Sequence, residues 1–428
     1  MKETAFNLER HLRYLTESIG VRLAGSAEER RAAEYLKDAF GKYSSAVTIE
    51  EFPVNERHVT SEKLEVLVNG EWQPYPCSLF SSSPSTDGEE LAAEIIFFDT
   101  ETGYQQPDLS YLRGKAVVHL GCHISNESDY RRLMEAKPAF ILFVDTRYPG
   151  TVQLADGLFP AYVSKFGALP SLNVAYMDAW KWKTEHATQA RIRVSGGCRK
   201  STTTVVVCEI PGSDPESGVI YAGGHHDTQA ATVGADDNAI GSASVVELAR
   251  LLSARPHRRT IRLISFGAEE QLSVGSVSYV RAHWDEIERD GVFMCNFDSC
   301  GSAMGWAEFT INANQELREL ISETYHSHGV YYKELLEACP YTDQFPFAAC
   351  GVPGIWLFRR NCQGGIFYHH RLDNTPDKID FGVSSQLVEA SADLIVRLSE
   401  AEEISRYRGI PSNLKKQIDA LYSSVYAF

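Results

Sequence analysis

Histidine and acidic side chains recur in five short segments that lie far apart along this chain. Imidazole and carboxylate groups suit zinc, with manganese or cobalt as possible substitutes. A lone Asp-Asp is usually a solvated turn, and a lone Glu-Glu at a helix start usually serves the helix dipole. The ordered set, however, predicts a two-metal hydrolase. The segments are Gly224-His225-His226-Asp227-Thr228, Gly234-Ala235-Asp236-Asp237-Asn238, Ala268-Glu269-Glu270, Phe297-Asp298-Ser299 and His369-His370.

The chemistry of such a centre requires particular groups. Two metal ions about 3.5–4 Å apart can hold one water between them as hydroxide and polarise the carbonyl group of a substrate. This arrangement needs a carboxylate that bridges the ions, a group that moves protons, and an outer histidine on each side. The five segments offer all of these groups.

The predicted strands place these groups at one edge of a sheet. Ligands of open α/β sheets bind beyond the carboxyl ends of the strands. Asp237 comes 12 residues after His225, on a loop that returns to this edge before the next helix. The predicted strands and the residues that follow them are 219–224 with His225, 260–266 with Glu269 and Glu270, and 291–297 with Asp298.

Strand and helix patterns alternate from about residue 202 onward. This alternation predicts an α/β fold, with a mostly parallel sheet covered by helices on both faces. Residues 8–42 are expected to add two helices, the second capped by Ser26. The expected helices of the later part are 238–254, 273–287, 315–327, 382–400 and 412–428, and a further strand is expected at 354–358.

The region between these two helical parts has a different character. Short apolar or alternating runs separated by turn signals predict a β-rich module, with one helix at 128–137. We therefore expect a discontinuous catalytic domain, residues 1–57 and 200–428, and an inserted domain, residues 58–199.

Composition narrows the classes of partner and location. The 428 residues carry a net charge of −16, which disfavours nucleic acid and anionic membranes as partners. The first ten residues lack the apolar core of a signal peptide, and no run of about 18 apolar residues predicts a membrane span. Nine scattered cysteines without a Cys-x-x-Cys pair favour a cytoplasmic protein with reduced thiols. A homo-oligomer is possible.

The five segments resemble the motifs of the co-catalytic dizinc exopeptidase family. That family includes bacterial leucyl aminopeptidases, aminopeptidase Y, plasma glutamate carboxypeptidase and glutamate carboxypeptidase II. Residues 224–227 are similar to its Gly-His-x-Asp motif, and 269–276 to its Glu-Glu motif followed by Gly-Ser. Residues 234–241 are similar to Gly-Ala-Asp-Asp-Asn-Ala-Ser-Gly, with Ile240 in place of Ser. The resemblance implies a three-layer phosphorylase/peptidase-type fold.

The resemblance also covers regions outside these motifs. Residues 20–36 are similar to the opening helices of the family, and 341–353 to a segment that ends in Gly-Ile-Pro, with Gln344 where His is common. Residues 108–145 resemble the protease-associated domain that some members carry. The matches together touch most of residues 15–380.

The resemblance assigns a role to each group. His225 and Asp298 would hold one zinc, Glu270 and His370 the other, and Asp237 would bridge the two ions. Glu269 would be the general base, and Asp227 would orient the ring of His225. A cis peptide bond is implied between Asp236 and Asp237.

The last ligand has two candidates. The family places a histidine four residues before Asp-Thr, whereas this chain has Asn374-Thr375. Counting from Asn374 gives His370, and counting from Asp373 gives His369. His370 is favoured because residues 375–380 then also fall into the register of the family.

The leading functional hypothesis is a metallo-aminopeptidase that hydrolyses the N-terminal bond of small peptides with a two-metal-activated water. Tyr341 and Phe345, together with Phe367 and Tyr368, are candidates for an apolar substrate pocket. Arg359 or Arg360, which follow the strand expected at 354–358, could bind a substrate carboxylate, which would favour a carboxypeptidase or dipeptidase. The remaining alternatives are a one-zinc amidase or cyclase and a non-catalytic receptor-like member of the family.

Overall fold

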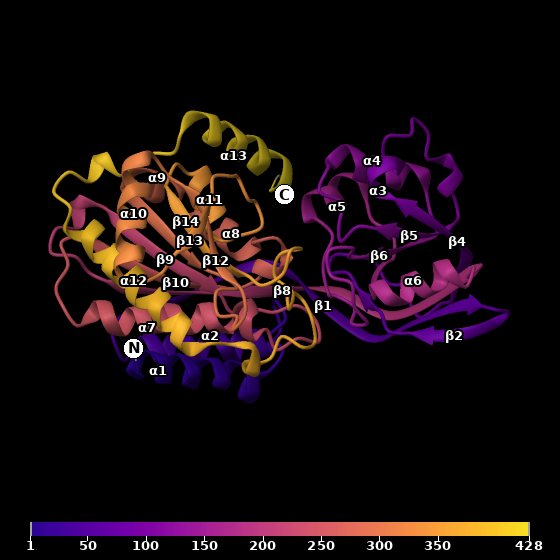
Figure 1. The fold of residues 1–428 in the computed structure, drawn as a ribbon, viewed down its shortest axis with the longest axis horizontal. Helices are drawn as coiled ribbons and strands as arrows, with labels where there is room; N and C mark the ends of the chain where they lie inside the picture. The colour runs from indigo at the N-terminus through magenta and orange to yellow at the C-terminus, as the bar shows by residue number, and fades with distance from the viewer. Residues whose placement is uncertain (1, 427–428) are drawn as a thin grey trace.

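The computed structural model describes residues 2–426 and has two lobes joined by two long strands (Figure 1). These strands, β1 (Ala46–Val68) and β8 (Gln189–Ile210), pair antiparallel along most of their length. The expected domain boundaries, after residues 57 and 199, fall inside β1 and β8 near the paired residues Arg57 and Cys198. The two lobes are therefore continuous through one ribbon of sheet.

The larger lobe is built on a mixed, mostly parallel sheet in the order β13-β12-β14-β11-β9-β10-β8. Its central pairs β9–β10, β9–β11 and β11–β14 are parallel, whereas β12–β14 and β8–β10 are antiparallel. β-Branched and other apolar residues fill the central strands because both of their faces are covered by helices. The strands are β9 (Val219–His225), β10 (Thr260–Phe266), β11 (Gly291–Phe297), β12 (Trp306–Asn312), β13 (Tyr332–Leu335) and β14 (Gly354–Arg360).

Helices cover both faces of this sheet, which confirms the predicted α/β fold (Figure 1). One face carries α1 (Lys2–Arg13), α2 (Ala27–Phe40), α7 (Ile240–Ser253), α10 (Gln315–Ser327) and α12 (Phe381–Glu400). The other face carries α8 (Val274–Ala282), α9 (Trp284–Asp290) and α11 (Gln344–Ala349), and α13 (Ser412–Val425) packs against α11.

The observed helix ends agree with some of the predicted bounds and differ from others. Ser26 caps α2 as expected, because its side chain accepts a hydrogen bond from the Glu29 N–H at 3.1 Å. The single helix expected at 273–287 is two helices that meet at His283. α13 ends at Val425, and Phe428 of the expected last helix lies outside the described residues.

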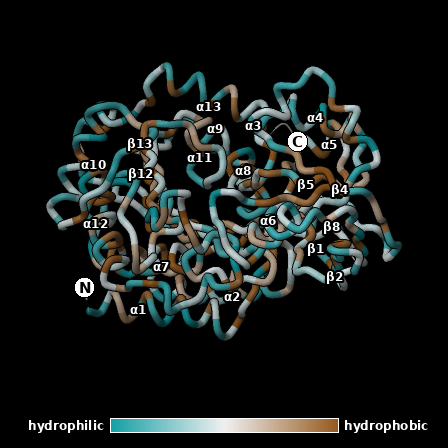
Figure 2. Tube along the Cα trace, turned by 45° about the vertical axis from the view of Figure 1, so that its right-hand side comes forward, coloured by the Kyte–Doolittle hydropathy of each residue, from teal (hydrophilic) through white to brown (hydrophobic). Residues whose placement is uncertain are grey.

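The sheet continues from β8 into the smaller lobe, where β4, β5, β6 and β7 run parallel and apolar strands line the interior (Figure 2). The strands are β2 (Glu71–Tyr75), β3 (Ser78–Leu79), β4 (Leu91–Asp99), β5 (Ala116–Leu120), β6 (Phe140–Val144) and β7 (Ser171–Val174). The helices are α3 (Thr100–Gly103), α4 (Glu127–Ala136), α5 (Pro160–Phe166) and α6 (Tyr176–Thr184).

The smaller lobe is thus more helical than the expected β-rich module. Helix α4 was expected, but α5 and α6 were not, because 7 and 9 residues are too few for a clear helical period. Within residues 2–426, no helix is both long and apolar enough to cross a membrane.

Candidate metal centre

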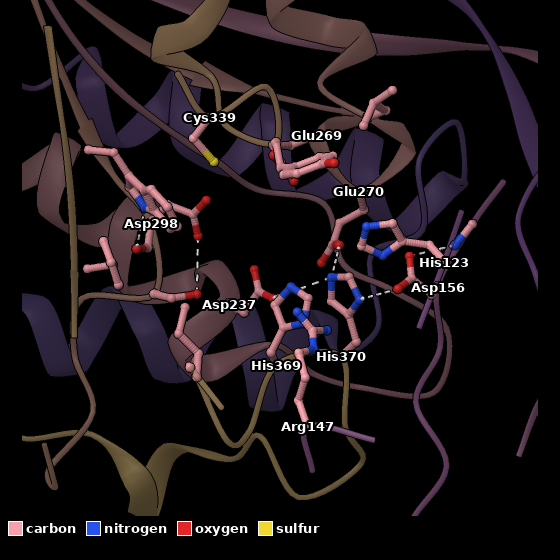
Figure 3. Close-up of a pocket in the computed structure, with 18 of the residues that line it drawn as sticks. His123, Arg147, Asp156, Asp237, Glu269, Glu270, Asp298, Cys339, His369 and His370 are labelled. Carbon is pink, nitrogen blue, oxygen red and sulfur yellow. Dashed lines mark hydrogen bonds and ion pairs between the residues drawn. The ribbon is translucent and has the colours of Figure 1, made fainter. Parts of the chain in front are cut away.

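A pocket opens at the carboxyl ends of β9, β10 and β11, where the larger lobe faces the smaller lobe (Figure 3). The larger lobe lines it with acidic groups and two histidines, and the smaller lobe supplies the opposite wall. The candidate ligands and base that line it are Asp237, Glu269, Glu270, Asp298, His369 and His370. His225, at the end of β9, is fully buried, and its ring contacts Asp237 of this group.

His225 faces the carboxylates on one side of the centre. Its Nε2 atom lies 3.1 Å from Asp237 Oδ1, 3.6 Å from Asp298 Oδ1 and 3.8 Å from Glu269 Oε2. Among the described residues this buried nitrogen has no hydrogen-bond partner. A buried polar atom without a partner is costly, so His225 Nε2 has the position expected of a metal ligand.

His370 occupies the other side of the same centre. Its Nε2 atom lies 2.7 Å from Glu270 Oε2 and 3.7 Å from Asp237 Oδ2. Asp237 is therefore the carboxylate shared by the two sides. The ring of His369 stacks on that of His370 at 3.5 Å, and its Nε2 atom lies 3.9 Å from Asp237 Oδ2.

The residues present fit a metal ion. Ligand atoms from His225, Asp237 and Glu270 lie within 4.8 Å of one another, and so do those from Asp237, His369 and His370. Imidazole with carboxylate is a donor set that zinc prefers. Because both histidines belong to the second group, the choice between them rests on the short contact of His370 with Glu270.

Asp227 links the segment that follows β9 to the segment that follows β10. Its carboxylate accepts hydrogen bonds from the backbone N–H groups of Glu269 at 3.0 Å and Glu270 at 3.2 Å. Asp227 Oδ1 also lies 3.4 Å from His225 Nδ1. This nitrogen faces away from the other carboxylates and also lies 3.2 Å from the Asp227 carbonyl oxygen, so Asp227 has the position of a group that orients the ring.

Burial and mutual contact shift the acid–base properties of the centre. Burial raises the pKa of Glu269 well above its usual range and that of Glu270 to about 7. Burial opposes the charged form of His370, but the neighbouring Glu270 carboxylate raises its pKa to about 9. Burial likewise opposes charge on His225, yet Asp227, Asp237 and Asp298 raise its pKa well above normal. Without a metal, the centre therefore retains protons that metal binding would displace.

Gly241, the last residue of the motif at 234–241, allows α7 to pack closely against β11. A Cβ atom on Gly241 would lie 2.2 Å from the Phe297 carbonyl oxygen, so α7 can approach β11 only with glycine there. The same carbonyl accepts a hydrogen bond from Asn238 Nδ2 at 2.7 Å.

The loop that carries Asp237 contains a cis peptide bond. It joins Asp237 to Asn238, so the expectation that it joins Asp236 to Asp237 is wrong by one residue.

The departure at Asn374 has a structural role. Asn374 Oδ1 accepts a hydrogen bond from the Asp236 N–H at 2.8 Å, and its carbonyl accepts one from Ala235 at 3.2 Å. Asp236 itself accepts from the Gly301 N–H at 2.8 Å. An amide oxygen is sufficient for this link between the histidine loop and the loop of Asp237.

Two of the candidate substrate residues, Tyr341 and Arg360, line the pocket. The residues that line it do not include Phe367 or Tyr368. Phe345 does not line it, because it is fully buried on α11 and packs against Tyr426. Arg359 does not line the pocket either, and its guanidinium donates to the carbonyl oxygens of Ser302 at 2.8 Å and Gly305 at 2.9 Å.

Several residues near the centre were missed at the level of sequence. Arg22 is fully buried beneath it and donates to the His226 carbonyl oxygen at 2.6 Å. It lies in the matched segment 20–36, which was the available signal. His123, Arg147 and Asp156 of the smaller lobe line the pocket, and no spacing in the sequence connects them to it.

Histidines and carboxylates gathered at the ends of the parallel strands of an α/β fold are typical of metal-dependent hydrolases. Residues 205–395 match the model of one family, described as Peptidase family M28. This match confirms the resemblance drawn from the motifs.

Individual proteins are similar over nearly the whole chain. Aminopeptidase YwaD of Bacillus subtilis is 24% identical over 96% of this chain and 87% of its own. Human carboxypeptidase Q is 24% identical over 86% of this chain and 80% of its own. The structure of BSAP, a zinc aminopeptidase from Bacillus subtilis, superposes with a TM-score of 0.76 at 18% identity, covering 96% of this chain and 98% of that chain. The fold of both lobes is thus shared with BSAP.

Proposed function

We propose that this chain is a zinc-dependent aminopeptidase that holds two zinc ions and removes the N-terminal residue of small peptides. One observation carries the proposal. His225 and His370 approach different oxygens of one carboxylate, Asp237, at 3.1 and 3.7 Å. A shared carboxylate between two histidines is the arrangement that a pair of metal ions requires. The names of YwaD and BSAP support the choice of aminopeptidase.

The residues divide into two ligand sets. His225 and Asp298 would hold one zinc, Glu270 and His370 would hold the other, and Asp237 would contact both. Bound zinc would polarise the carbonyl group of the scissile bond and make an attacking water more acidic.

Glu269 is the group placed to move protons. It is buried, and its carboxylate lies 3.8 Å from His225 Nε2 at the edge of the pocket. Ser273 Oγ donates a hydrogen bond to Glu269 Oε1 at 3.2 Å, and the other oxygen, Oε2, faces the metal centre. In the proposed reaction, Glu269 takes a proton from water and later gives it to the leaving amine.

The substrate preference separates this proposal from its alternatives. An aminopeptidase should cleave amino-acid amides and peptides with a free N-terminal amine, and acylation of that amine should abolish cleavage. The measurement is the rate of release for matched free and N-acetylated peptides. Cleavage of the blocked peptides alone would contradict the aminopeptidase proposal while leaving a metallopeptidase in place.

A carboxypeptidase or dipeptidase is the second candidate, and the position of Arg147 in the pocket wall favours it. Arg147 lines the pocket from the smaller lobe, and Asp145 binds its Nε and Nη2 atoms at 2.7–3.1 Å. A guanidinium at the pocket wall can bind a substrate carboxylate. Carboxypeptidase Q is among the relatives. Dipeptides cleaved much faster than their C-terminal amides would favour this alternative.

We also propose a reducing compartment such as the cytoplasm. All nine cysteines are unpaired in the described structure, as expected where thiols stay reduced.

A further inference from the structure

The segment 145–157 of the smaller lobe packs directly on the loop 361–374 that carries His369 and His370. The Ala155 N–H donates to the His370 carbonyl oxygen at 3.0 Å. The Tyr148 hydroxyl accepts from the Ile366 N–H at 3.0 Å and donates to the Gly364 carbonyl at 3.4 Å. These contacts join parts of the chain that lie more than 200 residues apart, so the smaller lobe fixes the backbone of this loop.

The side chain of His370 is also approached from the smaller lobe. Its Nε2 atom points to Glu270, and on the opposite side of the ring Nδ1 faces Asp156 Oδ2 at 3.9 Å (Figure 3). Among the described residues Nδ1 has no hydrogen-bond partner, although it is buried. The contact with Asp156 is electrostatic, because 3.9 Å is too long for a hydrogen bond.

Asp156 is itself held in position. Its Oδ1 atom accepts a hydrogen bond from the Gly157 N–H at 2.8 Å, which leaves Oδ2 directed to His370. His370 has a left-handed backbone conformation, with φ at 55°. A residue without glycine's freedom keeps such a conformation only where its surroundings enforce it, and the bond from Ala155 is one of those constraints.

A carboxylate faces the Nδ1 atom of each outer histidine of the centre. Asp227 Oδ1 lies 3.4 Å from His225 Nδ1, which also lies 3.2 Å from the Asp227 carbonyl oxygen, and Asp156 Oδ2 lies 3.9 Å from His370 Nδ1. A negative charge on this side of a metal-bound histidine favours the tautomer protonated at Nδ1 and makes Nε2 a stronger ligand. Asp227 comes from the larger lobe, whereas Asp156 comes from the smaller lobe.

We propose that Asp156 is a positioning residue that orients His370 for metal binding, and that the smaller lobe thereby completes one of the two zinc sites. The inference rests on the proposed function, in which His370 is a zinc ligand. It assigns the smaller lobe a part in building the centre, through the backbone bond of Ala155 and the carboxylate of Asp156.

The test compares zinc affinity in matched variants of the full chain. Asp156→Asn keeps the size and an oxygen that can accept from Gly157, but it removes the charge behind His370. We expect one of the two zincs to bind about 10- to 100-fold more weakly, since loss of such a support typically has this effect. The measurements are zinc content after dialysis against graded chelator, and the visible spectrum of the cobalt-substituted protein.

Two controls report on the fold of the smaller lobe. Asp108→Asn changes an exposed aspartate that contacts Ser110 within that lobe. Tyr130→Phe removes a hydroxyl that donates to the Gly167 carbonyl, and it matches Tyr148→Phe at the interface. Both controls should bind zinc as the unaltered chain does, whereas Tyr148→Phe should weaken the same site as Asp156→Asn.

A variant of His370 itself separates this inference from the proposed function. His370→Ala should lose one zinc, and adding Asp156→Asn to it should have no further effect on zinc content. If His370→Ala keeps both zincs, the proposed ligand set is wrong, and the inference fails with it. If His370→Ala loses a zinc while Asp156→Asn binds both with unaltered affinity and an unaltered cobalt spectrum, only the positioning role of Asp156 is overturned.

Discussion

Glu269 and Glu270 are adjacent, yet their surroundings give them different tasks. Glu270 Oε2 forms an ion pair with His370 Nε2 at 2.7 Å, so these two proposed ligands already face each other. The carboxylate of Glu269 contacts His225 Nε2 only at 3.8 Å and accepts from Ser273 Oγ. Motif order predicted these roles from a family resemblance, and the geometry supports them as proposals.

The role of Glu269 predicts a catalytic defect without metal loss. Glu269→Gln keeps the shape of the side chain but cannot accept a proton, so kcat should fall by about 10²- to 10⁴-fold. The zinc content should stay at two per chain, because Glu269 is not a proposed ligand. Steady-state kinetics and metal analysis on the same sample check both points. A variant with full activity would remove Glu269 from the mechanism.

Zinc affinity should depend strongly on pH. In the metal-free protein, Glu270 raises the pKa of His370 to about 9, and burial raises that of Glu270 to about 7. Both groups must lose their protons to bind zinc. Below pH 9 zinc must therefore displace a proton from His370, and below pH 7 a further one from Glu270.

The expected result is an affinity that rises from pH 6 to pH 8, with protons released on binding. Calorimetry in buffers of different ionisation enthalpy measures this release. An affinity that is independent of pH over this range would show that the two groups are already deprotonated in the metal-free chain.

At the scale of elements, the close contact between α7 and β11 holds the loop of Asp237 against the strand that precedes Asp298. Gly241→Ala would place a Cβ atom 2.2 Å from the Phe297 carbonyl and force the helix away. We expect a loss of about 1–3 kcal/mol in the free energy of unfolding, together with weaker zinc binding.

Urea unfolding and metal analysis test this prediction. The control is Gly41→Ala at the end of α2, where φ is −60° and the nearest atom is 3.2 Å from the added Cβ. If both variants are equally stable and retain zinc equally, the close approach of α7 is not a requirement of the site.

The elements also show what the sequence could and could not predict. The strands that end at His225, Phe266 and Phe297 are buried apolar runs, and the sequence places them correctly. Short helices such as α5 and α6 were missed, because a few residues give no clear period. Phe345 and Arg359 were misassigned, because proximity in sequence to a motif does not show which way a side chain points.

At the scale of the whole molecule, the pocket has walls from both lobes (Figure 3). The ligands of the larger lobe were predictable because each follows a strand of one sheet. His123, Arg147 and Asp156 were not predictable, because their approach depends on how the smaller lobe docks. That docking is set by the β1–β8 ribbon and by contacts at the histidine loop.

Zinc removal should destabilise the whole protein. The centre collects buried carboxylates whose mutual repulsion the metals would offset, and a ligand present at 100 times its Kd stabilises by about 2.7 kcal/mol per site. We expect a chelator to lower Tm and zinc to restore it, with Tm rising as the zinc concentration rises. Thermal unfolding at several zinc concentrations measures this effect. A Tm that does not respond to chelator or zinc would contradict a metal site in the core.

We place one zinc ion on each side of Asp237, and an anomalous difference map collected at the zinc edge would locate both ions. We expect two peaks about 3.5–4 Å apart. One peak should lie beside His225 and Asp298, and the other beside Glu270 and His370, with Asp237 between them. A single peak, or a second ion held by His369 instead of His370, would contradict this assignment.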